Sequence, residues 1–316
     1  MQLEMGKSKM GDHILPQVLL RGFSLNKNDA RNKQKIMVYD REKCKVSRIS
    51  TLYQQNTFYS REIESHLQKE YETPFGELKM DMEKELLENY SETYLISKEK
   101  LLLLIRFFVV MWRRNDVQLD KAKATIEKIV NYPGMREKMI PKFKNMTVNQ
   151  LISMNEKRAQ HDFYDKVILQ TTNEDPTVLK TYINYLPVII INKTNINFPL
   201  HNKYASIQYV YSNIKDYPDF TIEPINNRIY MLFVLNKQHK KNSDMNAIKV
   251  IYLDSVFEIE LLIRMYIIDT LKTIVVDESN IEIVKDKLTN KQTVKISLRD
   301  VKVQKFLDKI GLLMNN

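Results

Sequence analysis

The second half of the chain constrains the fold most, because its character changes near residue 183. Short segments rich in isoleucine, valine and tyrosine follow one another, separated by clusters of asparagine, aspartate, proline and lysine. β-Branched and aromatic residues favour strands, and the polar clusters favour turns. The sequence therefore predicts five strands, at LPVIIIN, NFPL, YASIQYVY, RIYMLFVL and AIKVIYL.

Beyond these strands, a helix is expected over residues 254–273 and a closing helix over roughly 298–313. Between them, IEIVKDKLTNKQTVKISL is interpreted as a β-hairpin that turns around Thr289, Asn290 and Lys291.

The first half has mainly helical spacing. After a predicted β-hairpin at KIMVYDREKCKVSRIS, apolar residues recur at Ile63, Leu67 and Tyr71 until Pro74 breaks or kinks the run. Ser97 is expected to cap a helix that ends near residue 114, and residues 118–166 are expected to be mostly helical. The prediction is an α+β fold in one domain, 1–316, with a helix-rich part (1–175) and a largely antiparallel, β-rich part (176–316).

Composition narrows the class of protein. Cys44 is the only cysteine, so an intramolecular disulfide is excluded and a reducing cytoplasm is the expected location. The apolar run LLLLIRFFVVMW, residues 101–112, contains Arg106 and is too short to cross a bilayer. We therefore expect a soluble cytoplasmic protein with no membrane partner, and the sequence does not indicate its oligomeric state.

Charge is distributed unevenly along a chain whose net charge is +10. Residues 1–60 hold eleven basic and five acidic side chains, 61–100 hold six and eleven, and 121–160 hold nine and three. A basic surface attracts nucleic acid or nucleotides. The alternative is a basic composition with no functional meaning, as in many lysine- and asparagine-rich chains.

Common catalytic signatures are absent from the sequence. No glycine-rich phosphate loop, HExxH or GxSxG occurs, and no two of the five histidines lie close enough to form a local ligand pair. A metal such as magnesium or manganese would need carboxylates from distant segments, and the cofactor stays undetermined.

The opening segment DHILPQVLLRGFS resembles the first motif of a bacterial family of unknown function, domain-of-unknown-function family 4238. That motif has the pattern H-Y-V-P, three residues, L-R, one residue, F-S. Ile14 and Leu15 replace the usual Tyr-Val, and the matching residues are His13, Pro16, Leu20, Arg21, Phe23 and Ser24.

Later features follow the order of that family between residues 12 and 265. They are Val38-Tyr39-Asp40, Phe58-Tyr59-Ser60, Ile63-Glu64 with Glu70 or Glu72, and Phe107 with Arg114. Phe198 and Asn202 match a later motif, where His201 stands for an aspartate and Lys203 for a proline. The resemblance implies no assigned activity, and the replaced aspartate puts catalysis in doubt.

These positions suggest a catalytic site formed by His13, Arg21, Glu64, Arg114, His201 and Asn202. A histidine can transfer a proton and arginines can stabilise phosphate charge, so phosphodiester or nucleotide-ester hydrolysis would suit this set. Each residue also has a structural alternative: His13 as a helix cap, Arg21 paired with Glu64, Arg114 at helix-end carbonyls and His201 on the surface. Tyr39, Tyr59 and Trp112 are expected to serve core packing rather than stacking on bases.

Three functions follow in order of preference. The first is a hydrolase of nucleic acid or nucleotides, for example a toxin or phage-defence effector. The second is a noncatalytic nucleic-acid-binding module, and the third is a protein-interaction partner that docks through acidic residues 61–100.

Overall fold

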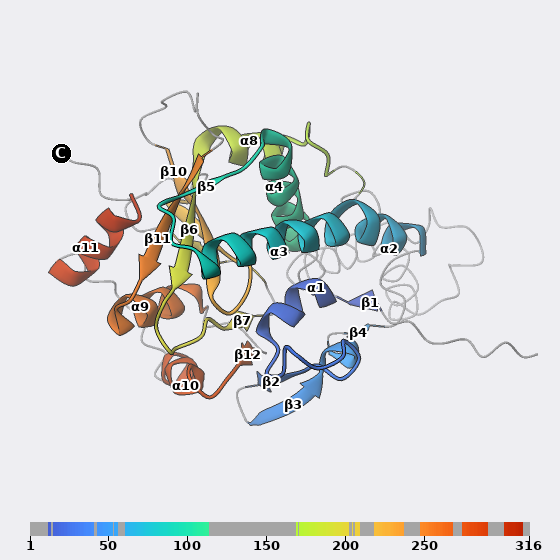
Figure 1. The fold of residues 1–316 in the computed structure, drawn as a ribbon, viewed down its shortest axis with the longest axis horizontal. Coiled ribbons are helices and arrows are strands. Elements are labelled where there is room, and N and C mark those ends of the chain that lie inside the picture. Colours follow the sequence, from blue (N-terminus) through green and yellow to red (C-terminus); the bar gives the residue numbers. More distant parts are fainter. Residues whose placement is uncertain are drawn as a thin grey trace, which may run out of the picture.

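The chain has an α+β fold, seen here in a computed structural model (Figure 1). The structure describes residues 12–13, 15–40, 43–52, 54–55, 61–113, 169, 171–201, 204, 206–208, 218–236, 247–267, 274–289 and 300–311. Its helices are α1 (Gln17–Leu20), α2 (Arg61–Leu67), α3 (Thr73–Glu88), α4 (Lys98–Arg113), α8 (Pro176–Asn184), α9 (Val256–Tyr266), α10 (Ile281–Thr289) and α11 (Val301–Lys309). Tighter or wider turns are η1 (Arg21–Phe23), η2 (Ile49–Thr51) and the π-helix η3 (Gln68–Glu72).

A central sheet of six strands has the order β5-β11-β6-β10-β9-β8. All its pairings are antiparallel except that of β11 with β6. The strands are β5 (Thr93–Leu95), β6 (Tyr185–Asn192), β8 (Ser206–Gln208), β9 (Phe220–Pro224), β10 (Ile229–Leu235) and β11 (Ala247–Leu253). The predicted largely antiparallel character is confirmed.

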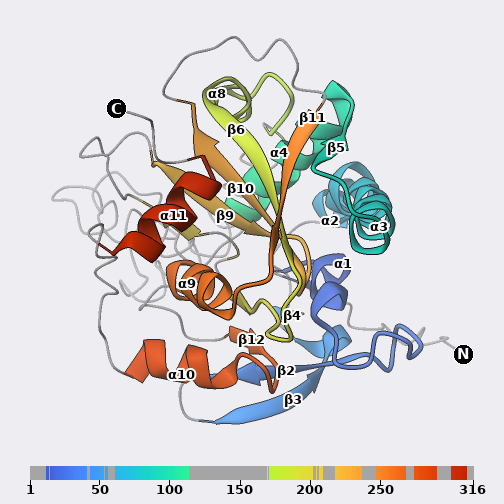
Figure 2. The ribbon, with the colours of Figure 1, turned by 60° about the vertical axis from the view of Figure 1, so that its left-hand side comes forward.

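Both faces of this sheet are covered. Side chains alternate along a strand, so Ile189 and Met231 pack with α3 and α4, while Ile190 and Leu232 pack with α9 and α11. Figure 2 shows these two helix layers on either side of the sheet. This two-sided burial explains why β6 and β10 are almost continuously apolar in sequence.

A second sheet of four strands has the order β3-β2-β12-β7, and β1 (Asp12–His13) pairs separately with β4 (Gln54–Gln55). The four strands are β2 (Lys35–Tyr39), β3 (Cys44–Arg48), β7 (Leu200–His201) and β12 (Ile274–Val276). The predicted hairpin is β2–β3. Because β12 joins β2 to β7, and β5 joins β11, the regions 1–175 and 176–316 share both large sheets.

The opening motif packs into the core. Leu15, Leu19, Leu20 and Phe23 are buried. The Gly22 carbonyl accepts a hydrogen bond from the Asn227 backbone N–H at 3.2 Å, at the turn between β9 and β10. A Cβ atom on Gly22 would lie 2.9 Å from Cβ of Asn226, so glycine allows this close approach.

Helix α4 carries the apolar run 101–112 into the core. The Ser97 side chain accepts a hydrogen bond from the Lys100 backbone N–H at 3.3 Å, which confirms the predicted cap. Leu104, Phe107 and Val110 are fully buried. Among the described residues, no helix combines the length and apolar character needed to cross a membrane.

The prediction of a hairpin over residues 281–298 is wrong in its first half, because Ile281–Thr289 is helix α10. Val284 and Leu288 are one turn apart and face the core formed with α9, so helical spacing outweighs the local alternation of IEIV. Three regions for which the sequence makes predictions lie outside the described residues: 290–299, the expected helices within 118–166, and 58–60.

Candidate functional site: a pocket between two helices and the central sheet

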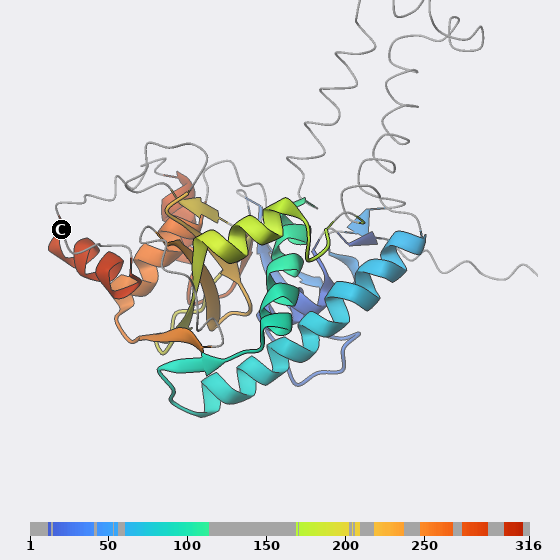
Figure 3. The same cartoon turned by 90° about the horizontal axis from the view of Figure 1, so that it is seen from above.

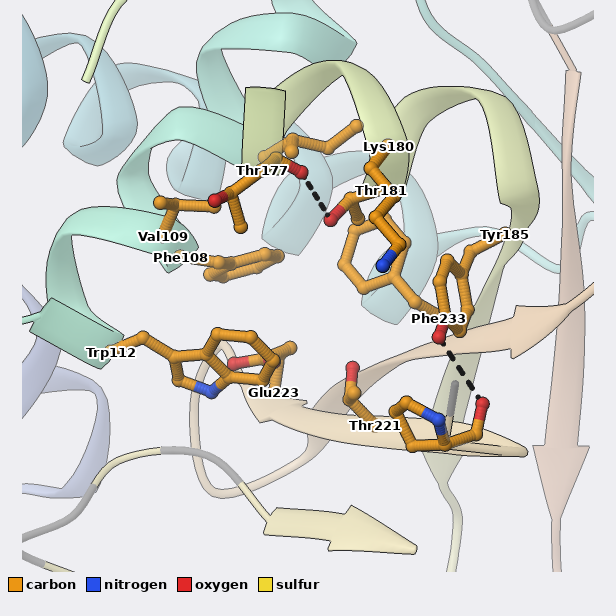
Figure 4. Close-up of a pocket in the computed structure, with 12 residues that line it drawn as sticks. Phe108, Val109, Trp112, Thr177, Lys180, Thr181, Tyr185, Thr221, Glu223 and Phe233 are labelled. Atoms are coloured by element: carbon orange, nitrogen blue, oxygen red, sulfur yellow. Dashed lines mark hydrogen bonds between the residues drawn. The ribbon is translucent and has the colours of Figure 1, made fainter. Parts of the chain in front are cut away.

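A pocket of about 160 Å³ lies where α4 and α8 meet the central sheet (Figure 4). Figure 3 shows α4 and α8 lying beside the sheet. Most lining side chains are apolar or hydroxyl-bearing, with one carboxyl and one amine. They are Ile105, Phe108, Val109, Trp112, Thr177, Lys180, Thr181, Tyr185, Pro218, Thr221, Glu223 and Phe233.

Strand β9 brings the carboxyl into the pocket. Thr221 and Glu223 are two residues apart and so face the same side of the sheet, opposite Phe233 and Met231 of β10. Phe220 and Ile222 face the other side and pack with α9. Successive side chains of FTIEP thus point to opposite faces of the sheet. On the face that lines the pocket, Glu223 places a carboxyl where an apolar residue is usual.

Glu223 is only 3% exposed. Burial raises the pKa of Glu223 well above its usual range, although the neighbouring Thr221 hydroxyl lowers it. Its Oε2 atom makes no hydrogen bond within the described part of the chain. Burial therefore favours the neutral form of this carboxyl, which can donate one hydrogen bond and accept another.

Aromatic rings form much of the remaining wall. The Phe108 and Phe233 rings meet edge to face with centroids 5.8 Å apart, and the Tyr185 hydroxyl donates to the Pro218 carbonyl at 3.2 Å. Trp112, the only tryptophan of the chain, is half-buried at the end of α4 and its indole lines the pocket. Figure 4 shows Lys180 extending from α8 toward the sheet.

An ion pair fixes α8 against α4. Arg113 contacts both carboxylate oxygens of Asp175, at 2.7 and 3.1 Å, and also donates to the hydroxyls of Thr171 and Thr177. Asp175 caps α8 by accepting the Thr177 backbone N–H at 2.8 Å. Burial alone would raise the pKa of Asp175, but the hydrogen bonds and charge of Arg113 lower it overall. The wall that carries Lys180 and Thr181 is therefore held rigidly.

Three of the residues predicted from the sequence, Arg21, Glu64 and His201, do not line this pocket. Arg21 is half-buried and donates to the Gln17 side chain at 2.9 Å. Burial lowers the pKa of Arg21, the charge of Arg31 lowers it further, and Glu72 opposes this. The suggested pairing of Arg21 with Glu64 stays a prediction. Glu64 lies in α2 and is partly buried.

His201 lies in β7 and is fully buried, not on the surface. Its ring stacks on Tyr266 with centroids 4.2 Å apart, in the core between β7 and α9. The backbone of His13 forms part of β1, while its side chain, Arg114 and Asn202 lie outside the described residues. The six-residue catalytic site thus stays a prediction.

Histidine, cysteine and carboxylate side chains are the usual ligands of metal ions in proteins. Within the described ranges, no three of them converge on one point. Magnesium or manganese binding stays an untested expectation.

The chain matches no protein-family model, curated protein or solved structure. The resemblance to domain-of-unknown-function family 4238 therefore stays a hypothesis that these comparisons neither support nor oppose.

Glu223 and Lys180 were missed by the sequence-based reasoning. The signal for Glu223 was present: an acidic residue in a strand-like run, flanked by Ile222 and Pro224, at a position that alternation assigns to the interior. Trp112 was interpreted as a core residue, and it does pack against the core while also lining the pocket.

Proposed function

We propose that the pocket binds a nucleotide-like ligand, with a flat, uncharged heterocycle next to Glu223. The observation that carries this proposal is the buried carboxyl of Glu223, whose Oε2 atom has no hydrogen-bond partner among the described residues. A buried polar atom without a partner costs about 1–3 kcal/mol. A ligand that supplies the missing partner recovers this energy.

Burial favours the neutral form of Glu223, and this form would select the kind of ligand. A neutral carboxyl can donate one hydrogen bond and accept another, which matches a ring with adjacent acceptor and donor atoms, such as a nucleobase edge. A cationic ligand would first have to remove the proton. A cationic ligand would also lie near Lys180, whose positive charge would repel it. The same charge favours an anionic substituent on the ligand, such as phosphate.

The walls suit a flat ring. Phe108, Trp112, Tyr185 and Phe233 offer aromatic surface, and base–aromatic stacking is worth roughly 1–3 kcal/mol per base. The volume of about 160 Å³ suits one base rather than an extended molecule. This function is a form of the noncatalytic binding considered from the sequence.

The experiment is a titration with nucleoside monophosphates and the matching nucleosides, followed by calorimetry and by Trp112 fluorescence. Because Trp112 is the only tryptophan, its signal reports on the pocket directly. Glu223→Gln keeps a donor and an acceptor and is expected to bind within a few-fold of the wild type. Glu223→Met is expected to bind about tenfold or more weakly, which corresponds to roughly 1.4 kcal/mol or more.

Lys180→Gln is the control for the phosphate. It is expected to weaken binding of the monophosphate by a few-fold and leave the nucleoside unchanged, because an exposed ion pair contributes up to about 1 kcal/mol. Equal binding by wild type and Glu223→Met, or loss of binding in Glu223→Gln alone, would contradict the proposed recognition.

Hydrolysis of nucleic acid or nucleotides is a separate proposal that rests on the sequence motif alone. It is tested by incubating the wild type and His13→Ala with RNA, single- and double-stranded DNA and nucleotides, with and without magnesium or manganese. Substrate loss in the wild type alone, with unchanged thermal stability of the variant, is the supporting outcome. Equal turnover by both proteins rejects His13 as a catalytic residue.

A further inference from the structure

A second feature concerns the β2–β3 hairpin and the turn before it. Described residues 24–40 and 43–52 carry seven exposed basic side chains: Lys27, Arg31, Lys33, Lys35, Lys43, Lys45 and Arg48. The same residues include two carboxylates, Asp29 and Asp40. Figures 1 and 2 place this hairpin at the opposite end of the molecule from α8, so it is separate from the pocket.

Basic side chains outnumber acidic ones at one end of the hairpin. Lys35 and Arg48 are directly opposite each other in the antiparallel register, a like-charge pair that destabilises a sheet. Arg31 and Lys33 precede Lys35 in the turn. None of these four makes an ion pair with any residue that the structure describes. At the other end of the hairpin, Nζ of Lys45 lies 3.7 Å from Oδ2 of Asp40. We call Arg31, Lys33, Lys35 and Arg48 the basic end of the hairpin.

The backbone beneath the basic end is well fixed. The Asn26 side chain accepts the Lys35 backbone N–H at 2.9 Å, and the Gln34 amide donates to the Lys27 and Asp29 carbonyls at 3.0 and 3.2 Å. The Ile49 backbone N–H donates to the Gln34 carbonyl at 3.1 Å. Hydrogen bonds thus fix the backbone that carries the four cations, and the described part of this turn contains one carboxylate, that of Asp29.

We propose that the basic end of the hairpin binds the phosphate backbone of nucleic acid. Exposed like charges that face each other gain most from a partner with closely spaced negative charges. Duplex nucleic acid offers one charge per roughly 1.7 Å of its axis and releases counterions when its phosphates are contacted. This surface carries no donor set arranged for a particular base, so it provides affinity and orientation rather than sequence readout.

The test uses the full chain and fluorescently labelled 25-base-pair DNA, single-stranded RNA of 25 nucleotides, and phosphatidylserine vesicles, over a series of salt concentrations. The variant is the double substitution Lys35→Gln and Arg48→Gln. The control is Lys84→Gln with Lys305→Gln, which removes the same charge from exposed positions on α3 and α11.

For duplex DNA, the slope of log affinity against log salt concentration is expected to be about 1.8 smaller in magnitude for the hairpin variant than for the wild type. This value assumes that each of the two substitutions removes one phosphate contact, which contributes about 0.9 to the slope. Its affinity near 0.1 M salt is expected to fall roughly tenfold or more, while the control binds almost as the wild type. Equal effects of the two variants would overturn the proposal. So would binding to vesicles without binding to either nucleic acid, or no binding at all.

Discussion

Glu223 gives the structure a measurable dependence of stability on pH. In the unfolded chain its carboxyl loses a proton near the usual pKa of 4.5, whereas in the folded chain burial raises that pKa well above this value. Above pH 4.5 the folded state therefore binds more protons than the unfolded state. The free energy of unfolding falls with rising pH, by about 1.4 kcal/mol for each pH unit over which the folded carboxyl stays protonated.

Glu223→Gln removes this titration and preserves the shape of the side chain. At pH 4 the variant and the wild type are expected to have similar free energies of unfolding. As the pH rises above 4.5, the variant is expected to become progressively more stable than the wild type, by at most about 1.4 kcal/mol for each pH unit.

The assay is urea denaturation of both proteins between pH 4 and pH 7.5, with the free energies extrapolated to zero denaturant. Glu278→Gln, at an exposed turn position, is the matched control and is expected to follow the wild type closely. Parallel curves for the wild type and Glu223→Gln over the whole range would refute the reasoning, because they would mean that Glu223 titrates alike in both states.

Two further predictions concern the elements around the pocket. Asp175→Ala is expected to destabilise the chain by about 3–5 kcal/mol at pH 7, because it removes the α8 cap and leaves Arg113 without its carboxylate. Since the folded pKa of Asp175 is lowered, its contribution is present above pH 3.8 and disappears as the pH falls through the folded pKa. Denaturation of the variant at pH 7 and pH 2.5 checks this, and an equal loss at both would argue for packing instead. Gly22→Ala is expected to cost about 1–3 kcal/mol, because its Cβ would meet Asn226 at 2.9 Å. An unchanged melting temperature would show that the turn between β9 and β10 moves freely away from Gly22 in η1.

The fold class followed from patterns that act locally. The hairpin β2–β3, the Ser97 cap and the strands β6, β10 and β11 each have strong strand or capping signals within a few residues. Where two local signals competed, the prediction was wrong: IEIV alternates like a strand, but Val284 and Leu288 bury one face of α10 against α9. Packing against α9 determines the secondary structure of that segment, and local alternation of apolar residues does not predict it.

The pocket was harder to predict because it depends on contacts between distant segments. Thr221 and Phe233 become neighbours through the register of β9 and β10, and Trp112 lines the same pocket because α4 packs across that face. A sequence shows that Glu223 is an acidic residue in an apolar run, but not which helix covers it. His201 illustrates the reverse case, since a motif position suggested chemistry and the structure places the ring against Tyr266 in the core.

The position of β12 between β2 and β7 has a consequence for protein synthesis. Val38 of β2 pairs with Val275 of β12, which is translated long after it. At elongation rates of about 5–20 residues per second, the outer edge of β2 lacks this partner for roughly 10–50 s. An uncovered strand edge can pair with other chains, so slow translation is expected to favour aggregation of the nascent chain.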